Sequence, residues 1–457
     1  MKNQKSTLLN ELETFQATKH QSTTTFDVCL FDGGFLLHSF LSKTGRIVSM
    51  GNLARNLLCY VANLYHANEI NICFDTYSRV SLKYGERLRR GENEAEFLIT
   101  GPTQKPDQSC DILLKNSSFK NELYIFLKIE WQKSEYISYL EGKTLYVSYG
   151  GSCVQIQYGS TTPEHLQGKH AEADTLLAFH TRHSKRDIVI RASDTDVLII
   201  LLAMIGKHNE DDTPIVYNSI NMDVGVGNSQ RLIDVSQIYE TLEILSPGLP
   251  VALPGLHSFT GSDYTAAFYW KGKLTPLKLL MEEDGNEWIT AFREMSLPTF
   301  NKETDIEGFV CALYGSRDSG STNVVRTRKI LKLQTTNKNT GANDKNEDRL
   351  KMVDCGLLPP CQKVLLKKIL RAQLVARMWF NADQAEPNFG LDPTNFGWRM
   401  VDGCFHPDWY SGSALPRSKD LETFISERET KEKDADKIDA IWNLSGRILM
   451  MMRRKKI

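Results

Sequence analysis

The chain has 457 residues, of which 41% are hydrophobic and 24% are charged, and its formal net charge is −1. This composition is typical of soluble globular proteins and excludes a disordered, collagen-like or membrane-embedded chain. It also excludes a uniformly basic nucleic-acid-binding protein, so any basic surface must be local. The N-terminal sequence MKNQKSTLLNELETF mixes acids with bases. It predicts neither a signal peptide nor a membrane span, so we expect an intracellular protein.

The nine cysteines of the chain favour the same setting. Their number is odd, no C-x-x-C pair occurs, and several lie inside apolar runs, as Cys29 does in FDVCLF and Cys73 in INICF. Buried free thiols in a reducing compartment explain this usage better than a disulfide scaffold does.

The first patterned region predicts the start of an α/β unit. Residues 26–31 form a short apolar run that ends at Asp32, and residues 70–74 form a second run that ends at Asp75. Between them, apolar residues of segment 47–66 recur at intervals of three and four, which is the spacing of one helix face. The pattern of strand, helix and strand, with an acid at the end of each strand, is typical of α/β folds.

Further strands and helices extend this pattern. Residues 91–143 are expected to be an insertion of loops and helical pieces, a helix is expected from residue 172, and the apolar run VLIILLAMI predicts a buried helix. Additional strands are predicted at 145–149, 154–157, 187–192 and 214–219. We therefore expect a mainly parallel sheet assembled by crossover helices.

The second half of the chain has less pattern. We expect one domain over residues 26–283, a helical extension at 284–333, and a linker or loop at 334–348, where the sequence QTTNKNTGANDKNED has no apolar residue larger than alanine. Residues 349–457 are expected to form a helical and irregular C-terminal region, which includes an amphipathic basic helix at 361–380. The RRKK motif near the end of the chain is compatible with a nuclear location, and a solvated tail is the simpler interpretation.

Seven acidic residues are candidates for one metal site. They follow predicted strands or begin predicted helices: Asp32, Asp75, Glu172, Asp174, Asp194, Asp196 and Asp263. Residues beyond the carboxyl ends of parallel strands converge on one crevice. Carboxylates gathered there would repel one another unless cations compensated them. Mg²⁺ or Mn²⁺ fits best because these hard ions take oxygen ligands, and two ions roughly 4 Å apart would serve phosphodiester hydrolysis.

Each acid taken singly also has an ordinary structural interpretation. An aspartate after a strand is commonly a turn residue or a helix cap, and acids are favoured in the first turn of a helix. Asp194 and Asp196 alone would be explained by a capping turn. The order and context of the motifs together are more specific, because the ordinary explanation would have to hold independently for each of them.

The order of the motifs resembles that of the PIN-like structure-specific 5′ nucleases, the family of the flap endonucleases and their repair relatives. The matching motifs are FDGG, ICFDTYS, AEAD, SDTD and TGSDY, within about residues 26–90 and 165–283. The resemblance implies a three-layer α/β/α domain, a two-metal nuclease site formed by the seven acids, and a helical duplex-binding segment at about 255–283. Residues 357–416 resemble a stretch found in uncharacterised eukaryotic relatives of these nucleases, and this second similarity implies no chemistry.

Basic residues accompany the acids. Lys83, Arg87 and Arg90 have the spacing of one helix face, and such a face beside a metal site would contact phosphate. The resemblance implies catalytic roles for Lys83 and Arg90, which match the family's lysine and arginine seven residues apart, and the alternative is an ordinary solvated helix face. For the duplex backbone we expect contacts from Lys271, Lys273 and Lys278, although the family's G-x-G hairpin is replaced by Lys-Gly-Lys.

These observations predict a metal-dependent nuclease that uses two Mg²⁺ or Mn²⁺ ions and hydrolyses DNA or RNA. Of the two nucleic acids, DNA is the one that we expect as its partner. The alternative is a catalytically inactive PIN-like module that binds nucleic acid or a protein partner. A phosphatase or nucleotide hydrolase is a third class, but the chain has no GxxxxGK[ST] loop of a P-loop enzyme.

Overall fold

The computed structural model describes residues 5–17, 25–44, 46–184, 186–210, 217–338 and 355–412. The chain divides into two compact units, the first comprising Met1–Ile306 with Leu366–Trp409 and the second Glu307–Leu365 with Tyr410–Ile457. Residues 366–409, which we expected to belong to a separate C-terminal region, are therefore part of the first unit. In the expected linker, helix α15 (Thr322–Lys338) continues through residue 338, and residues 339–348 lie outside the described part of the chain.

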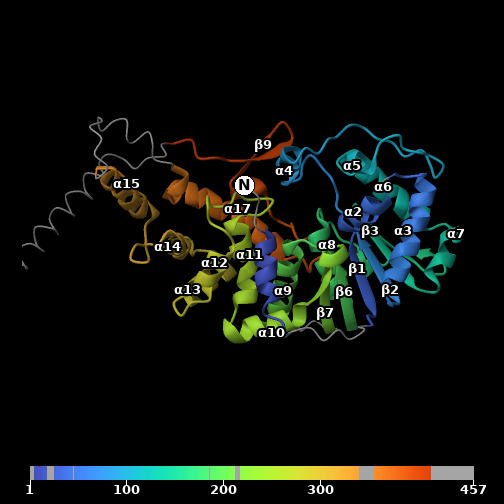
Figure 1. Cartoon of the computed structure of the whole chain (residues 1–457), viewed down its shortest axis with the longest axis horizontal. Helices are drawn as coiled ribbons and strands as arrows, with labels where there is room; N and C mark the ends of the chain where they lie inside the picture. The colour runs from blue at the N-terminus through green and yellow to red at the C-terminus, as the bar shows by residue number, and fades with distance from the viewer. Residues whose placement is uncertain are drawn as a thin grey trace, which may run out of the picture. The chain divides into compact units, whose positions relative to one another are not determined.

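An eight-stranded sheet forms the centre of the first unit (Figure 1). Its order is β5-β4-β3-β2-β1-β6-β7-β8. The five central strands, β3, β2, β1, β6 and β7, are mutually parallel. The edge strands β4, β5 and β8 form antiparallel pairs. The strands are β1 Val28–Asp32, β2 Glu69–Cys73, β3 Thr144–Tyr149, β4 Ser152–Ile156, β5 Ser160–Thr161, β6 Arg186–Arg191, β7 Tyr217–Val224 and β8 Arg231–Asp234. The predicted α/β class with a mainly parallel sheet is confirmed.

The central strands are apolar because helices cover both of their faces. β1 reads VCLFD and is buried up to its last residue, as expected for a parallel strand without a solvent face. On one face, α3 (Met50–Leu64) buries Leu53, Leu57 and Val61, and its N-cap Ser49 accepts a hydrogen bond from the backbone of Asn52. On the other face, α8 (Ala173–His183) packs against β1 and β2.

Helix α6 (Ser117–Glu130) changes the interpretation of the expected insertion at 91–143. Its side chains Phe119, Leu123 and Leu127, with the following Trp131, are fully buried in the same apolar core as β1, β2 and α3. Residues 91–109 are mostly irregular, as expected, but α6 is a covering helix of the sheet. It lies far along the sequence from the preceding strand β2, and this distance hid its role from the sequence analysis.

The remaining helices of the first unit surround this core, and residues from Leu366 onward add to them. They are α1 Lys5–Glu13, α2 Gly33–Thr44, α4 Tyr84–Arg89, α5 Cys110–Leu113, α7 Ser134–Ile137, α9 Thr195–Glu210, α10 Val235–Leu245, α11 Leu249–Thr260, α12 Leu274–Leu280, α13 Asn286–Glu294 and most of α17 Gln362–Phe380, followed by the hairpin β9 Trp398–Val401 and β10 Cys404–Pro407. Asp402 and Gly403 of the hairpin turn both have positive φ, as a two-residue type I′ turn requires.

The second unit contains most of α14 (Glu303–Leu313) and α15. The buried carboxylate of Glu307 joins its parts, because it accepts hydrogen bonds from the backbone nitrogen of Thr322 at 2.7 Å and from the side-chain amide of Gln362 at 3.1 Å.

One predicted strand has different bounds in the structure, and two short strands were not predicted. Of the strand expected at 214–219, residues 214–216 lie outside the described part of the chain, and residues 217–219 begin β7, which continues to Val224. The short strands β5 and β8 were not anticipated. No helix in the described ranges is long and apolar enough to cross a membrane.

Candidate metal centre

The acids lie at one edge of the sheet because of its register. Asp32 is the last residue of β1 and pairs with Cys73 of β2, and Phe31 pairs with Arg191 at the end of β6. Asp75 follows β2 and Asp194 follows β6 within a few residues. The carboxyl ends of three adjacent parallel strands thus bring these acids to the same crevice, as the sequence predicts.

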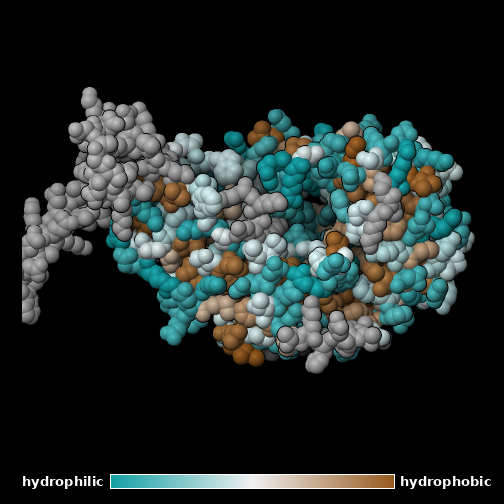
Figure 2. Space-filling view, in the orientation of Figure 1, coloured by the Kyte–Doolittle hydropathy of each residue, from teal (hydrophilic) through white to brown (hydrophobic). Residues whose placement is uncertain are grey.

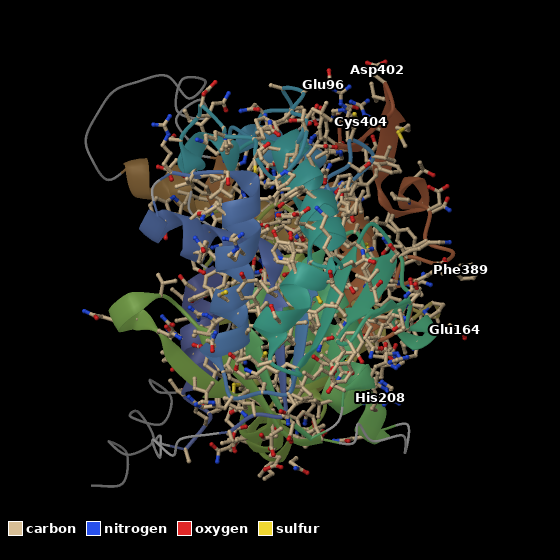
Figure 3. The ribbon with its side chains drawn as sticks, turned by 90° about the vertical axis from the view of Figure 1, so that its right-hand side faces the viewer. Glu96, Glu164, His208, Phe389, Asp402 and Cys404 are labelled. Atoms are coloured by element: carbon tan, nitrogen blue, oxygen red, sulfur yellow. The ribbon has the colours of Figure 1, made fainter. Side chains whose placement is uncertain are left out.

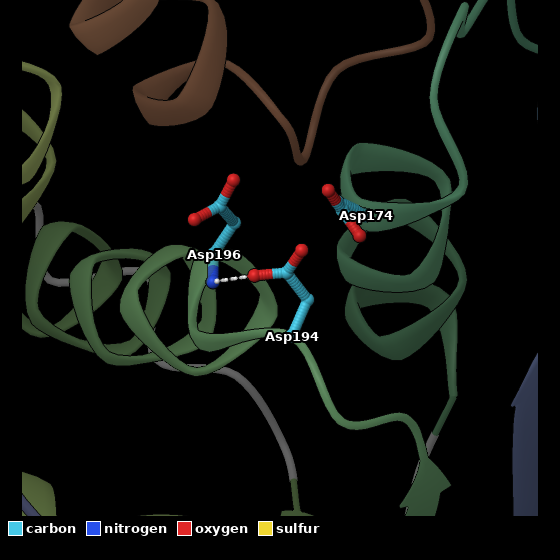
Figure 4. Close-up of side chains that lie close together, drawn as sticks. All are labelled: Asp174, Asp194 and Asp196. Atoms are coloured by element: carbon cyan, nitrogen blue, oxygen red, sulfur yellow. Dashed lines mark hydrogen bonds between the residues drawn. The ribbon is translucent and has the colours of Figure 1, made fainter. Parts of the chain in front are cut away.

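Asp174, Asp194 and Asp196 form the tightest group, which we call the aspartate cluster (Figure 4). One carboxylate oxygen from each residue lies within 4.8 Å of the others. Asp174 is in the first turn of α8 and Asp196 is in the first turn of α9. The backbone nitrogen of Asp196 donates a 3.1 Å hydrogen bond to Oδ1 of Asp194. The N-terminal ends of two helices, where anionic groups are favoured, therefore meet at this cluster.

Asp32 and Asp75 lie beside it. Oδ1 of Asp32 accepts from the backbone of Phe35 at 3.0 Å, and Oδ1 of Asp75 accepts from the backbone of Ala173 at 2.7 Å. Both carboxylates approach Gly34, where an added Cβ would lie 3.3 Å from Asp32 and 3.7 Å from Asp75. A glycine at this position leaves space directly beside two acids.

Burial and mutual repulsion raise the pKa values of Asp32 and Asp174. Burial, then the charges of Asp75 and Asp194, raise the pKa of Asp32 to about 7. Burial also raises the pKa of Asp174 well above its usual value, and the charges of Asp194, Asp196 and Asp32 add to this although Lys83 opposes it. Holding these carboxylates ionised therefore costs free energy, and a divalent cation among them would offset that cost.

Lys83 lies inside this acidic site. Its Nζ is 2.6 Å from Oε2 of Glu172 and 3.7 Å from Oδ2 of Asp174, and 4.9 Å from the ring centre of Tyr264. Burial alone would lower the pKa of Lys83, but the nearby acids, with Glu172 first among them, raise it well above its usual value. Lys83 is therefore a fixed cation within the site, and the expectation that it accompanies the acids agrees with the geometry.

Arg90 reaches the site from the other end of the same short helix. Its guanidinium donates to Oδ1 of Asp263 at 2.6 Å and to Glu86 at 3.0 Å, and half of its side chain remains exposed. The guanidinium of Arg87 lies over the ring of Tyr77 and donates to the carbonyl of Ser78, and its charge also acts on Glu172. Lys83 and Arg90 flank the six-residue helix α4, and the backbone nitrogen of Arg87 donates to the carbonyl of Lys83 as in a helical turn. That the three side chains form one phosphate-binding face stays a prediction.

The three lysines expected to contact the duplex differ in burial. Lys273 is buried, and its ammonium group donates to the carbonyls of His257 (2.7 Å) and Gly261 and to the hydroxyl of Thr260 (2.9 Å). It therefore caps the C-terminal end of α11, and its predicted phosphate contact is wrong. Lys271 is half-buried and Lys278 is exposed, so their roles stay predictions.

His257 was missed by the sequence interpretation. Its Nε2 lies 2.9 Å from Oδ1 of Asp196, and both side chains are fully buried. The two residues are far apart in the sequence and lie on α11 and α9. The nearest sequence signal is the position of His257 shortly before the TGSDY motif that contains Asp263, and a lone histidine within an apolar helix gives no indication of its partner.

The C-terminal part of the first unit reaches this edge of the sheet. The backbone nitrogen of Lys169, just before Glu172, donates to the carbonyl of Ala385 at 2.7 Å. Hairpin strand β10 packs against α4; Figure 3 shows Asp402 and Cys404 of the hairpin. Figure 2 shows a hollow with a largely hydrophilic rim, right of its centre, in the part of the view where Figure 1 labels α4 and α8.

No protein-family model matches the chain, and no curated protein sequence matches it either. The geometry of the site therefore has to carry the functional argument.

Proposed function

We propose that the chain is a metal-dependent nuclease that hydrolyses phosphodiester bonds of nucleic acid, with a PIN-like fold and two Mg²⁺ or Mn²⁺ ions. The observation that carries the proposal is the aspartate cluster, whose three carboxylate oxygens lie within 4.8 Å of one another. The donor set suits these ions, because it consists of carboxylates and holds no cysteine. The raised pKa values of Asp32 and Asp174 support it, since a cation would stabilise the ionised forms.

Each group of side chains has a distinct part in this mechanism. Asp174, Asp194 and Asp196 would hold one ion, and Asp32 and Asp75, on the neighbouring strand ends, would contribute to the second. Bound divalent ions supply an acidified water nucleophile and charge stabilisation for the leaving oxygen. Lys83 and Arg90 are held beside the acids by Glu172 and Asp263. From there they would contact the scissile phosphate and stabilise the negative charge that develops on it.

One observation favours the alternative, a PIN-like module that binds without cleaving. Glu172 and Asp263 are already paired with Lys83 and Arg90, and such internal ion pairs reduce the need for metal. Titration of the protein with Mg²⁺, followed by calorimetry, separates the two functions. Absence of binding at millimolar metal would favour the non-catalytic module.

The direct test is cleavage of labelled flap and gapped DNA, and of the RNA equivalents, with Mg²⁺. We expect cleavage by the wild-type protein and its loss in Asp194→Ala. Asp187→Ala is a matched control, because Asp187 lies on the same strand β6 at the opposite end, where its carboxylate accepts from Ser219. Equal cleavage by wild type and Asp194→Ala would refute the proposal.

The cellular setting belongs to the same proposal. Eight cysteines, which include Cys29 and Cys73, are described as free thiols. Free thiols are typical of reducing compartments, and we propose an intracellular location on that basis.

A further inference from the structure

His257 contacts the aspartate cluster from a separate helix. The 2.9 Å distance between Nε2 of His257 and Oδ1 of Asp196 is that of a hydrogen bond, and neither side chain is exposed to solvent. When Asp196 is ionised, Nε2 of His257 carries a hydrogen and donates a hydrogen bond to the carboxylate. The contact therefore constrains the orientation of one carboxylate of the cluster.

The position of His257 is itself fixed by its surroundings. The ring of Trp379, on α17, lies 5.7 Å from the imidazole at an interplanar angle of 31°. Lys273 donates to the backbone carbonyl of His257 at 2.7 Å. On the next residue, the hydroxyl of Ser258 donates to the carbonyl of Ala372, which is also on α17. Helix α17 thus contacts α11 at His257 and at the residue that follows it.

We propose that His257 is a positioning residue for the metal site, which holds the Asp196 carboxylate in the orientation needed to bind an ion together with Asp174 and Asp194. This inference rests on the proposed function, and it extends the site to α17, which keeps the imidazole in place. Metal-binding side chains are commonly oriented by hydrogen bonds from a second layer of residues, and loss of such a partner typically lowers metal affinity about 10- to 100-fold.

A simple buried ion pair would produce a different pattern. If His257 only stabilises the fold, its replacement lowers stability and leaves metal affinity unchanged in the protein that remains folded. Two neutral amides distinguish the cases. Glutamine places its amide nitrogen as many bonds from Cβ as the Nε2 of histidine, whereas the amide nitrogen of asparagine is one bond shorter and corresponds to Nδ1. His257→Gln preserves the donor to Asp196, and His257→Asn does not.

The chain offers a matched control at the other end of α9. His208 is buried, and its Nε2 lies 2.9 Å from Oδ2 of Asp383, which repeats the contact type of His257 and Asp196 away from the aspartate cluster. Figure 3 labels His208 near the lower end of its view. His208→Asn removes an equivalent histidine–aspartate contact without changing a cluster residue.

The experiment measures Mn²⁺ binding to the full chain by calorimetry, with unfolding curves to establish the folded fraction of each variant and with Mg²⁺ dependence of cleavage as a second readout. We expect the metal dissociation constant to rise about 10- to 100-fold in His257→Asn. His257→Gln should remain within a few-fold of wild type, and His208→Asn should equal it. The KM for nucleic acid at saturating metal should change little in any variant.

The outcomes separate this inference from the proposed function. Unchanged metal affinity in folded His257→Asn would overturn the inference even if the wild type cleaves. An equal loss in His257→Asn and His257→Gln would also overturn it. Metal binding that depends on His257 in a protein that never cleaves would support the inference and refute nuclease activity. A wild-type protein that binds no Mn²⁺ would refute both.

Discussion

Replacement of Asp32 by asparagine should stabilise the metal-free protein above neutral pH. The pKa of this carboxyl group is about 7 in the folded chain, against a reference value of 3.8, and burial is the first cause. Since the folded-state pKa is raised, the protonated form stabilises the fold fully below about pH 4. That contribution is lost as pH rises through 7.

The size of the effect follows from the same values. A shift of about three units corresponds to about 4 kcal/mol of unfolding free energy between low and high pH, at about 1.4 kcal/mol for each unit. Asparagine has no charge to bury, and its Oδ1 can still accept the hydrogen bond from Phe35. The unfolding free energy of Asp32→Asn should therefore not show this decrease between pH 4 and pH 8.

Urea unfolding of both proteins between pH 4 and pH 8, in the presence of a chelator, measures this difference. We expect the wild type to lose more stability across the range and Asp32→Asn to be the more stable protein at pH 8. Added Mg²⁺ should reverse this order, because the ion binds the ionised wild-type site and stabilises the folded state. Parallel pH profiles for the two proteins, or a less stable variant at pH 8, would refute the reasoning.

Three further predictions concern individual contacts. Lys83→Met should lower metal-free stability by about 3 kcal/mol, because it leaves Glu172 buried without its cation, and unchanged thermal unfolding would contradict this role. Lys273→Ala should lower the unfolding free energy by about 1–3 kcal/mol, because it leaves carbonyls at the end of α11 without a donor. Replacement of the exposed Lys278 by alanine should change the unfolding free energy little. If Lys273→Ala is as stable as wild type but binds DNA more weakly, Lys273 contacts phosphate after all. Leu123→Ala should lower the unfolding free energy, measured with denaturant, by about 2–5 kcal/mol. An unfolding free energy within about 0.5 kcal/mol of the wild-type value would show that α6 is not part of the core.

The parts of the site that the sequence predicts depend on parallel strand ends. Asp32, Asp75 and Asp194 each follow an apolar run, and the parallel register brings such positions together without knowledge of any side-chain contact. Short spacing also predicts that Asp194 and Asp196 lie at the start of one helix. These features follow from local pattern and one topological rule.

The remaining features depend on tertiary packing that a single sequence does not encode locally. His257 meets Asp196 because α11 packs on α9, and its Trp379 neighbour comes from α17. Lys273 resembles a surface lysine in sequence, yet the chain turns back after α11 and places its ammonium group on the helix end. The short edge strand β5 has two exposed residues, so it lacks the hydrophobic pattern by which strands are usually identified.

The backbone pairing of Lys169 with Ala385 has a consequence for synthesis of the protein. During translation the eight strands of the central sheet and all seven acids emerge first, while Trp379 and Ala385 emerge only after the whole of the second unit's α15. A ribosome-bound chain therefore carries its acidic edge before the residues that pack against it. Nascent chains released before Glu386 should expose this charged edge and be recognised by proteases more readily than the finished protein.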